Sequence, residues 1–286
     1  MNERTFTTWA KPMTQAEFDR FSGFIIGQCG IKMPQSKKIM LEARLQKRLR
    51  TLGIPTFGEY LSHILGEDGR DELVHMLDAV TTNKTDFFRE PVHFQYLSQA
   101  ILPEFHQERM TTGSRPFFLW SAGCSTGEEP YTLAMVLTEF AEQHPEFRFS
   151  IVATDISTRV LDRARDGIYD ADRVSTVPPE FKQRYLLKSK DHTRNQVRIV
   201  PGLRAAVQFR RLNLMEEALS FPEPLDVIFC RNVIIYFDRN TQERLISRFC
   251  RLLRPDGYLF LGHSESIHGF DLPLRRITST VYRKSD

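Results

Sequence analysis

The first part of the chain, residues 14–80, carries its apolar positions at helical spacing and shows no convincing strand pattern. A helix is predicted over 14–28, because Thr14 followed by Glu17 is a capping-box pattern and Gly30 is a helix stop. Two shorter helices are predicted over 57–65 and 70–80. This part is therefore expected to form a small all-helical domain.

The longest helix of this part is predicted over 36–52, with Gly53 as its stop. Its apolar stripe consists of Leu41, Leu45, Leu49 and Leu52. At about 100° per residue, Lys37, Arg44 and Arg48 fall within about 40° of one another beside that stripe. The segment 37–50 contains a single acid, Glu42, so the helix is expected to present a basic face.

After residue 115 the pattern changes to short apolar runs separated by turns and helices. The run 117–120 is followed by a glycine-containing turn, a helical segment and a second apolar run over 147–155. Strand, turn, helix and strand in this order are typical of a right-handed parallel unit. Further strands are predicted over 207–212, 225–230, 257–262 and 277–284, and a helix over 240–253. The predicted fold class is a doubly wound α/β domain.

One stretch departs from this alternation. Within 188–212, the pairs Val197/Ile199 and Val207/Phe209 alternate with polar neighbours on either side of Pro201-Gly202. This pattern predicts a half-buried β-hairpin, which we interpret as a small antiparallel insertion in the domain.

Length and composition limit the function classes. At 286 residues the chain is near the upper limit for one hydrophobic core, so one large domain with an appendage is expected. There is no apolar run of membrane-spanning length and no secretory signal pattern, so a cytoplasmic protein without membrane insertion is expected. A net charge of +3 is too small to indicate a nucleic-acid partner. The four cysteines show no metal-type clustering, and no metal site is predicted.

The turn after the first strand carries a candidate nucleotide site. Gly123 and Gly127 allow close backbone approach to a ligand, and Pro130 suits the first turn of the following helix. The next strand ends at Asp155, whose carboxylate can accept both hydroxyls of a ribose. Ligands of parallel sheets bind beyond the carboxyl ends of the strands, so an adenosine site is predicted there.

Two acids in that turn, Glu128 and Glu129, indicate which adenosine ligand is expected. A pyrophosphate needs bare helix amides, and these carboxylates would repel it, which disfavours a dinucleotide. They suit a ligand with a sulfonium and an ammonium group, and S-adenosylmethionine has both. The alternative interpretation is that acids favour helix N-termini through the helix dipole.

The chain also contains six motifs in the order found in one family, the CheR chemotaxis-receptor methyltransferases, which it resembles along nearly its whole length. They are TTNKTDFFRE (81–90), SAGCSTGEEPY (121–131), ATDIS (153–157), LNL (212–214), FCRNVIIYF (229–237) and GHSES (262–266). The resemblance implies a helical N-terminal domain, a Rossmann-like S-adenosylmethionine methyltransferase domain and a small inserted antiparallel β-subdomain. It places these at 1–80, 93–286 and about 170–206, with 81–92 as a linker to the cofactor site.

The resemblance also implies a function and a set of site residues. The substrate would be glutamate side chains of chemoreceptor cytoplasmic helices, methylated from S-adenosyl-L-methionine with S-adenosyl-L-homocysteine as product. The residues expected to contact the cofactor, besides Gly123, are Asn83, Thr85, Arg89, Glu129, Asp155, Asn213, Leu214, Arg231 and Asn232. Arg89 and Tyr236 match the two polar residues expected beside the methyl group.

Elementary chemistry agrees with a carboxylate acceptor. A glutamate has an unperturbed pKa of about 4.3, so it is already nucleophilic at neutral pH and needs no general base. Arg89 is expected to orient the reacting groups, with a linker ion pair as the alternative. Tyr236 is expected to fix them with its hydroxyl, with a packed aromatic as the alternative. His263 is interpreted as structural because this reaction needs no base.

Partner contacts are expected on the basic helix. The resemblance implies that Arg44, Lys47, Arg48 and Arg50 dock on acidic receptor helices, whereas basic runs in general are more often solvated surface. Some family members hold a C-terminal receptor peptide through a glycine-bearing loop of the β-subdomain. The corresponding stretch here, KSKDHTRNQVRIV, has no glycine, so such tethering is not expected. The chain is expected to be a monomer.

Three other functions remain open alternatives on the sequence. One is a methyltransferase for a nucleic acid or a small molecule, which should lack the basic helical domain and the β-insertion together. Another is a scaffold that binds the cofactor without turnover, and the third is an NAD-dependent dehydrogenase, which the turn chemistry disfavours.

Overall fold

The structure is a computed structural model that describes residues 11–112, 115–191 and 193–285. Its internal contacts divide the chain into two compact units. The helical unit comprises Met1–Thr82 with Tyr236–Asp238, and the sheet unit comprises Asn83–Ile235 with Arg239–Asp286. No helix among the described residues is long and apolar enough to cross a membrane.

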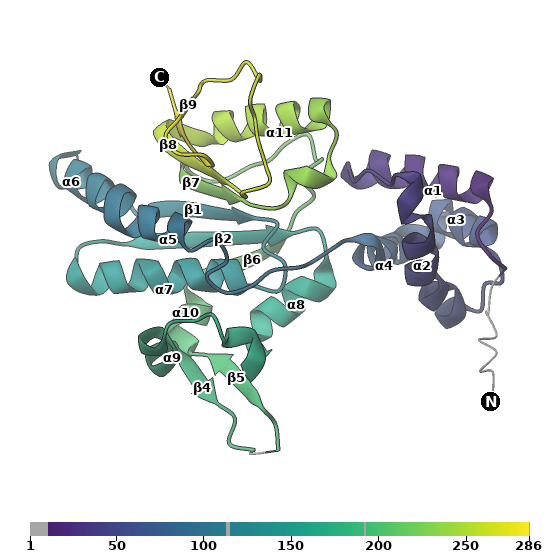
Figure 1. Ribbon diagram of the computed structural model, residues 1–286, viewed down its shortest axis with the longest axis horizontal. Coiled ribbons are helices and arrows are strands. Elements are labelled where there is room, and N and C mark those ends of the chain that lie inside the picture. Colours follow the sequence, from purple (N-terminus) through teal and green to yellow (C-terminus); the bar gives the residue numbers. More distant parts are fainter. Residues whose placement is uncertain (1–10, 113–114, 192, 286) are drawn as a thin grey trace. The chain divides into compact units, whose positions relative to one another are not determined.

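The helical unit is built from the elements that the hydrophobic pattern predicts. They are α1 (Gln15–Cys29), the 3-10 turn η1 (Gln35–Lys37), α2 (Lys38–Leu52), α3 (Phe57–Leu65), the 3-10 turn η2 (Glu67–Gly69) and α4 (Arg70–Val80), which Figure 1 colours from purple to blue. The predicted capping box is confirmed: the Thr14 hydroxyl accepts from the Glu17 amide, and the Glu17 carboxylate accepts from the Thr14 amide. Gly30 and Gly53 end their helices in the left-handed conformation, as predicted.

The core of the helical unit lies between the apolar stripes of its helices. Of the predicted apolar stripe, Leu41, Leu45 and Leu49 are fully buried, whereas Leu52 is 38% exposed. Leu52 is the last residue of α2, directly before the left-handed Gly53 that ends the helix. Phe21 of α1 stacks on Tyr60 of α3, with ring centroids 6.2 Å apart.

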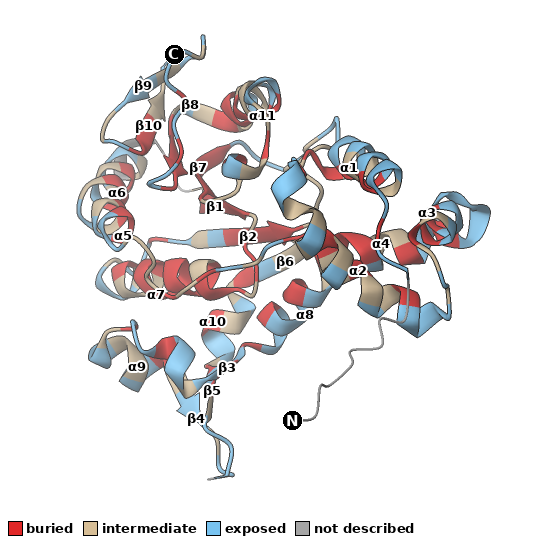
Figure 2. Cartoon of the chain, turned by 45° about the vertical axis from the view of Figure 1, so that its right-hand side comes forward, coloured by how far each residue is buried: buried red, intermediate tan, exposed pale blue. Residues whose placement is uncertain are grey.

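The sheet unit contains a seven-stranded sheet with the strand order β6-β2-β1-β7-β8-β10-β9. In that order the strands are Val207–Arg211, Phe149–Asp155, Phe117–Ala122, Leu225–Cys230, Leu253–Leu261, Val281–Lys284 and Leu274–Arg276. The first five are parallel, and β10 is antiparallel to both of its neighbours. The predicted α/β fold with a mostly parallel sheet is confirmed. Figure 2 shows the central strands in the buried colour, as expected for a sheet covered on both faces.

Alternate residues of β1 face opposite layers of helices. Phe117 packs on Phe105 of α6 (Leu102–Thr112), with ring centroids 5.3 Å apart. Trp120 points the other way and packs on Phe249 of α11 (Arg239–Leu252), at 5.2 Å. The remaining helical elements are α5 (Val92–Tyr96), the π-helical turn η3 (Leu97–Ile101), α7 (Glu128–Gln143), α8 (Thr158–Asp166), α9 (Pro179–Tyr185), α10 (Pro201–Ala205) and the 3-10 turns η4 (Ala171–Val174) and η5 (Ile234–Tyr236).

A second, three-stranded sheet is inserted between α8 and β6. Its order is β3-β5-β4, with β3 Ile168–Asp170, β4 Leu186–Lys188 and β5 Gln196–Ile199, and all its pairs are antiparallel. The expected small antiparallel sheet is therefore present, but the predicted hairpin between Val197/Ile199 and Val207/Phe209 was wrong. Pro201 starts the short helix α10 instead of a turn, and the strand after it pairs in parallel with β2 of the large sheet.

Other boundaries also differ from the hydrophobic pattern. No element was predicted over 92–112, where the structure has α5, η3 and α6. The predicted helix over 240–253 ends at Leu252, because Leu253 already pairs with Leu225 of β7 at the start of β8. The predicted closing strand is confirmed in part as β10, which is paired with the unpredicted edge strand β9.

Candidate functional site

The candidate site lies at the carboxyl-end edge of the large sheet. The strand order reverses between β1 and β7. Strands β2 and β6 lie on one side of β1, whereas β7 and β8 lie on its other side. Parallel strands end at one edge, so the segments after β1, β2, β6 and β7 meet there. The predicted cofactor residues Gly123, Asp155, Asn213 and Arg231 all follow or end one of these strands.

Two glycines shape the turn after β1. Gly123 has φ 78° and Gly127 has φ 96°, both in the left-handed region that favours glycine. A Cβ on Gly123 would lie 2.5 Å from the Val233 side chain, and one on Gly127 would lie 2.9 Å from Ala164. Sequence reasoning assigned the glycines to close approach by a ligand. The structure shows that close packing of the protein's own segments already requires them.

Asp155, at the end of β2, is buried beside this turn. Its Oδ2 accepts from the Ser125 amide at 2.9 Å, and its Oδ1 accepts from the Ser157 amide at 3.0 Å. These two bonds fix the carboxylate between the glycine turn and the start of α8. A carboxylate held in this way at the end of a strand is the group that the sequence predicts for the ribose hydroxyls.

The two acids at the start of α7 have different environments. Glu128 is buried, accepts from the Thr126 hydroxyl at 2.6 Å and pairs with Arg173 of η4 at 2.5 Å. Glu129 accepts from the Ser121 hydroxyl at 2.7 Å and from Arg231 at 3.1 Å. Burial raises the pKa of the Glu129 carboxyl, and the positive charge of Arg231 opposes that shift. A second cation beside Glu129 would therefore stabilise its ionised form. Glu128 already has a cationic partner in Arg173.

Arg231 connects three segments at this edge. From the end of β7 its guanidinium donates to Glu129, to Glu90 at 3.0 Å and to the backbone carbonyl of Arg89. It also lies over the Phe94 ring, 5.3 Å from the centroid. The side chain is buried, so these contacts position helix α7 and the segment 89–90 relative to the sheet.

The predicted linker residues lie along one strained segment. The Asn83 carbonyl accepts from the Ser125 hydroxyl at 3.0 Å, and the Thr85 carbonyl accepts from Arg173 at 2.9 Å. Arg89 lies between Phe88 and Glu90, which have φ 51° and φ 56°. Left-handed backbone at two non-glycine residues costs about 1–3 kcal/mol each and requires the surrounding contacts to hold it. The Arg89 guanidinium donates to the Lys84 carbonyl at 3.1 Å and is half-buried.

The remaining predicted cofactor residues lie in the loops after β6 and β7. The Asn213 side chain accepts from the Met215 amide at 3.0 Å, and the Leu214 carbonyl accepts from Arg248 at 2.6 Å. Asn232 has φ 59°, and its amide donates to Glu265 at 2.9 Å.

Glu265 is a site-building residue that sequence reasoning missed. It is buried, and its carboxylate accepts from the amides of Gly262, Asn232, Val233 and Ile234 at 2.6–2.9 Å. Burial raises its pKa, and the four backbone bonds oppose that shift. Arg173, Glu90 and Ser121 were also missed. The only signal for Glu90, Ser121 and Glu265 was their membership of the family motifs, and Arg173 had none.

The other predicted residues belong to the helical unit. Tyr236 ends η5, its carbonyl accepts from the Lys32 amide at 2.9 Å, and Lys37 lies 5.5 Å from the centre of its ring. Arg44 donates to the carbonyl of Val80 at 2.7 Å.

The four residues predicted to dock on a receptor divide into two pairs. Arg48 forms a two-pronged ion pair with the buried Glu72, at 2.9 and 2.5 Å, and Arg44 is bonded to the end of α4. Lys47 and Arg50 are exposed. Arg44 and Arg48 therefore hold α2 against α4, and Lys47 and Arg50 form the outward part of the basic face.

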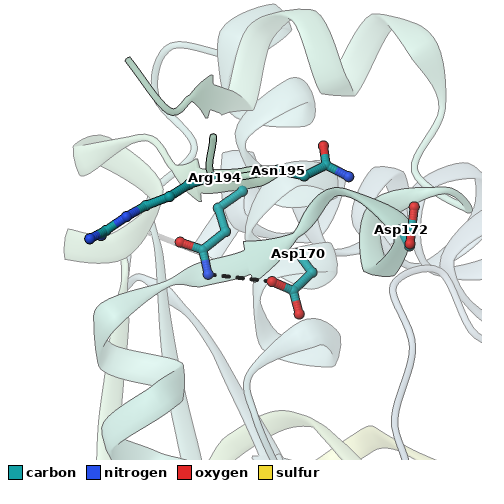
Figure 3. Close-up of a pocket in the computed structure, with 5 residues that line it drawn as sticks. Asp170, Asp172, Arg194 and Asn195 are labelled. Carbon is teal, nitrogen blue, oxygen red and sulfur yellow. Dashed lines mark hydrogen bonds between the residues drawn. The ribbon is translucent and has the colours of Figure 1, made fainter. Parts of the chain in front are cut away.

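A pocket is present on the inserted sheet and the η4 turn. Figure 3 shows its lining, Asp170, Asp172, Arg194, Asn195 and Gln196, with the Gln196 amide donating to Asp170 at 3.3 Å. None of the predicted site residues lines it.

Comparison with known families gives matches to both parts of the chain. Residues 83–283 match the family described as CheR methyltransferase, SAM binding domain, and residues 16–81 match the CheR methyltransferase all-alpha domain. The chain belongs to the CheR methyltransferase family. Its cofactor is accordingly S-adenosylmethionine and its class is methyltransferase, as the paired acids and the resemblance predicted.

Curated relatives cover nearly the full length. A chemotaxis protein methyltransferase of Borreliella burgdorferi is 39% identical over 96% of this chain and 95% of the relative. Chemotaxis protein methyltransferase 2 of Pseudomonas aeruginosa is 41% identical over 94% and 93%. The chemotaxis protein methyltransferase of Escherichia coli is 38% identical over 96% and 92%.

Proposed function

We propose that this CheR family methyltransferase esterifies glutamate side chains on the cytoplasmic helices of chemoreceptors. The relatives that match it over nearly their full length are chemotaxis protein methyltransferases, which supports a substrate in the chemotaxis system. The glutamate acceptor and the receptor contacts are implied by the resemblance to the family, and the chemistry of this chain adds only that a carboxylate acceptor needs no base.

The residues at the sheet edge fit S-adenosylmethionine. Glu129 is a carboxylate whose pKa is raised by burial, and a cationic ammonium group would offset that cost. Asp155, fixed at the end of β2 by the Ser125 and Ser157 amides, would accept from the ribose hydroxyls. Asn213 and Leu214 would lie beside the adenine, and Asn83, Thr85, Arg231 and Asn232 would complete the pocket. When bound, the cofactor supplies a methyl group already activated by the positive sulfur.

One observation supports a carboxylate acceptor: five carboxylates that the structure describes at this edge are already hydrogen-bonded. Each of them already accepts hydrogen bonds from the protein, and they are Glu90, Glu128, Glu129, Asp155 and Glu265. An acceptor that must lose a proton, such as an amine or a hydroxyl, would need a general base, a role that carboxylates already bonded to the protein fill poorly. A carboxylate acceptor is ionised at neutral pH and needs none.

The residues of this chain are then required for alignment and for exclusion of water from the acceptor. Arg89 would orient the acceptor carboxylate or the cofactor through its planar donor fork. Tyr236 would fix the reacting groups through its hydroxyl. Receptor helices would dock on the basic face of α2 through Lys47 and Arg50, since Arg44 and Arg48 are bonded within the helical unit. Recognition of a C-terminal receptor peptide is not part of this proposal.

The test is incubation of the purified chain with methyl-labelled S-adenosylmethionine and receptor cytoplasmic fragments. We expect label on the receptor that alkali releases, because methyl esters hydrolyse and methyl amines do not. A matched fragment with the methylated glutamates changed to alanine should take up no label. Label that resists alkali would indicate another acceptor class, and cofactor binding without transfer would indicate a scaffold.

A further inference from the structure

Glu90, His93 and His263 form a cluster of metal-ligand side chains next to Arg231. They come from the segment before α5, from α5 itself and from the loop after β8. One ligand atom from each lies within 4.8 Å of the other two. Glu90 Oε2 is 3.5 Å from His93 Nδ1 and 3.9 Å from His263 Nε2.

His93 supplies a second observation that points to a ligand. The residue is 2% exposed, its Nε2 is bonded to the Thr280 hydroxyl at 2.7 Å, and its buried Nδ1 has no hydrogen-bond partner. Nδ1 faces the Glu90 carboxylate at a distance too long for a hydrogen bond. If Nδ1 carries no proton, its lone pair faces a carboxylate oxygen, an arrangement that a cation between the two would stabilise.

The geometry suits a small transition-metal ion. Zinc binds histidine nitrogen and carboxylate oxygen at about 2.0–2.2 Å in tetrahedral geometry, which places neighbouring ligand atoms about 3.4 Å apart. The two distances from Glu90 Oε2 are close to that separation. The bond from His93 Nε2 to Thr280 is the type of contact that orients a metal-ligating histidine. His263 is 53% exposed and provides access from solvent.

We infer that Glu90, His93 and His263 bind Zn²⁺ and that this binding opposes binding of S-adenosylmethionine. Glu90 Oε2, the oxygen that faces both histidines, also accepts from Arg231 at 3.0 Å. Zn²⁺ on this oxygen displaces Arg231, whose other arm holds Glu129 and which also donates to the Arg89 carbonyl. The metal is an inhibitor and not a participant in methyl transfer. Mg²⁺ and Ca²⁺ do not compete, because they prefer all-oxygen sites.

The predicted loss of cofactor affinity on zinc binding rests on the proposed function, in which Glu129 and Arg231 bind the cofactor. The metal site itself does not depend on that proposal. Binding of S-adenosyl-L-homocysteine is therefore the readout, because it requires no receptor substrate and is independent of the glutamate acceptor. A second cluster, His106, His144 and Glu146, contains potential zinc ligands and must be removed. The experiment accordingly uses the full chain with His106→Gln as background.

In this background, calorimetric titration with zinc chloride after chelator treatment should give one equivalent of binding, and magnesium chloride should give none. Adding His263→Gln should abolish zinc binding while leaving the affinity for S-adenosyl-L-homocysteine without zinc unchanged. Saturating Zn²⁺ should weaken that affinity about tenfold in the background variant and not in the double variant. Three results would each overturn the inference. They are zinc binding that survives His263→Gln, no zinc binding in the background variant, and zinc binding that leaves the affinity for S-adenosyl-L-homocysteine unchanged.

Discussion

Arg231 is the residue on which the contacts of the cofactor edge converge. Its guanidinium reaches Glu129 through one terminal nitrogen and Glu90 and the Arg89 carbonyl through the other, and a lysine has no such fixed fork of two nitrogens. We predict that Arg231→Lys weakens binding of S-adenosyl-L-homocysteine about tenfold although the charge is kept. Equilibrium titration measures this, with Arg244→Lys on the exposed side of α11 as the matched control. Equal losses in both variants would contradict a specific role for the donor fork.

Arg89 and Tyr236 carry the prediction about the reaction step. If they align the reacting groups, Arg89→Ala and Tyr236→Phe should each lower kcat, by up to about 100-fold, with little change in the unfolding transition. Arg89→Lys should recover only part of the rate, because it lacks the fork. Single-turnover rates with a receptor fragment measure the effect. Wild-type kcat in both Arg89→Ala and Tyr236→Phe would remove the two residues from the mechanism.

At the residue scale the sequence predicted where side chains lie in the sheet better than it predicted which residues they contact. Gly123, Glu129 and Asp155 lie at one edge of the sheet, as expected because parallel strands end at the same edge. The sequence could not distinguish Glu128 from Glu129, since both are acids in the first turn of α7. Only the fold brings Arg173, from the inserted sheet's η4 turn, onto Glu128 and leaves Glu129 beside Arg231. The spacing of residues along a short stretch of sequence does not show which distant segments will contact it.

At the scale of elements, the helices of the helical unit were predictable because each carries its own start and stop signals. Thr14, Glu17, Gly30 and Gly53 act within a few residues of the helix ends that they fix. The strand over 207–211 lacked such a signal. The alternation of apolar and polar residues in this strand fits either a hairpin or an edge strand of the large sheet. In the structure the strand pairs with β2, more than 50 residues earlier in the chain, and is therefore an edge strand of the large sheet.

The contact between α2 and α4 makes a prediction about pH. Burial raises the pKa of Glu72, but the hydrogen bonds from Arg48 and Tyr60 lower it by more, and the pKa lies below its usual value. Glu72 therefore stabilises the fold above its unfolded pKa of about 4.3, and this contribution is lost as pH falls through the lower folded pKa. Glu72→Gln should cost about 2 kcal/mol of unfolding free energy at pH 7.

Urea unfolding of wild type and Glu72→Gln across pH 3–7 tests this prediction. The difference between the two should be constant from pH 7 to about pH 5 and should shrink below about pH 4.3. Glu59→Gln on the neighbouring helix α3 is the matched control, because Glu59 belongs to the same unit and forms no ion pair with any residue that the structure describes. A difference that grows on acidification would contradict the assigned direction.

At the scale of the whole molecule, the charge of the helical unit and the chemistry of the sheet unit make separate contributions to the proposed function. The sheet unit contains all the proposed cofactor residues, and Tyr236, proposed to fix the reacting groups, belongs to the helical unit. The helical unit contains the basic face of α2, of which Lys47 and Arg50 point outward. Receptor recognition and cofactor binding should therefore respond to different substitutions.

The last prediction separates these two contributions. The double variant Lys47→Glu/Arg50→Glu should lower the rate of receptor methylation at low salt by about tenfold or more and should weaken its salt dependence, because rim charges act mainly on association. Its affinity for S-adenosyl-L-homocysteine should stay at the wild-type value. The control is Arg163→Glu/Arg251→Glu, which makes the same change in net charge at exposed positions near the ends of α8 and α11. If the control slows methylation as much as the α2 variant does, the effect belongs to net charge and α2 is not the docking face.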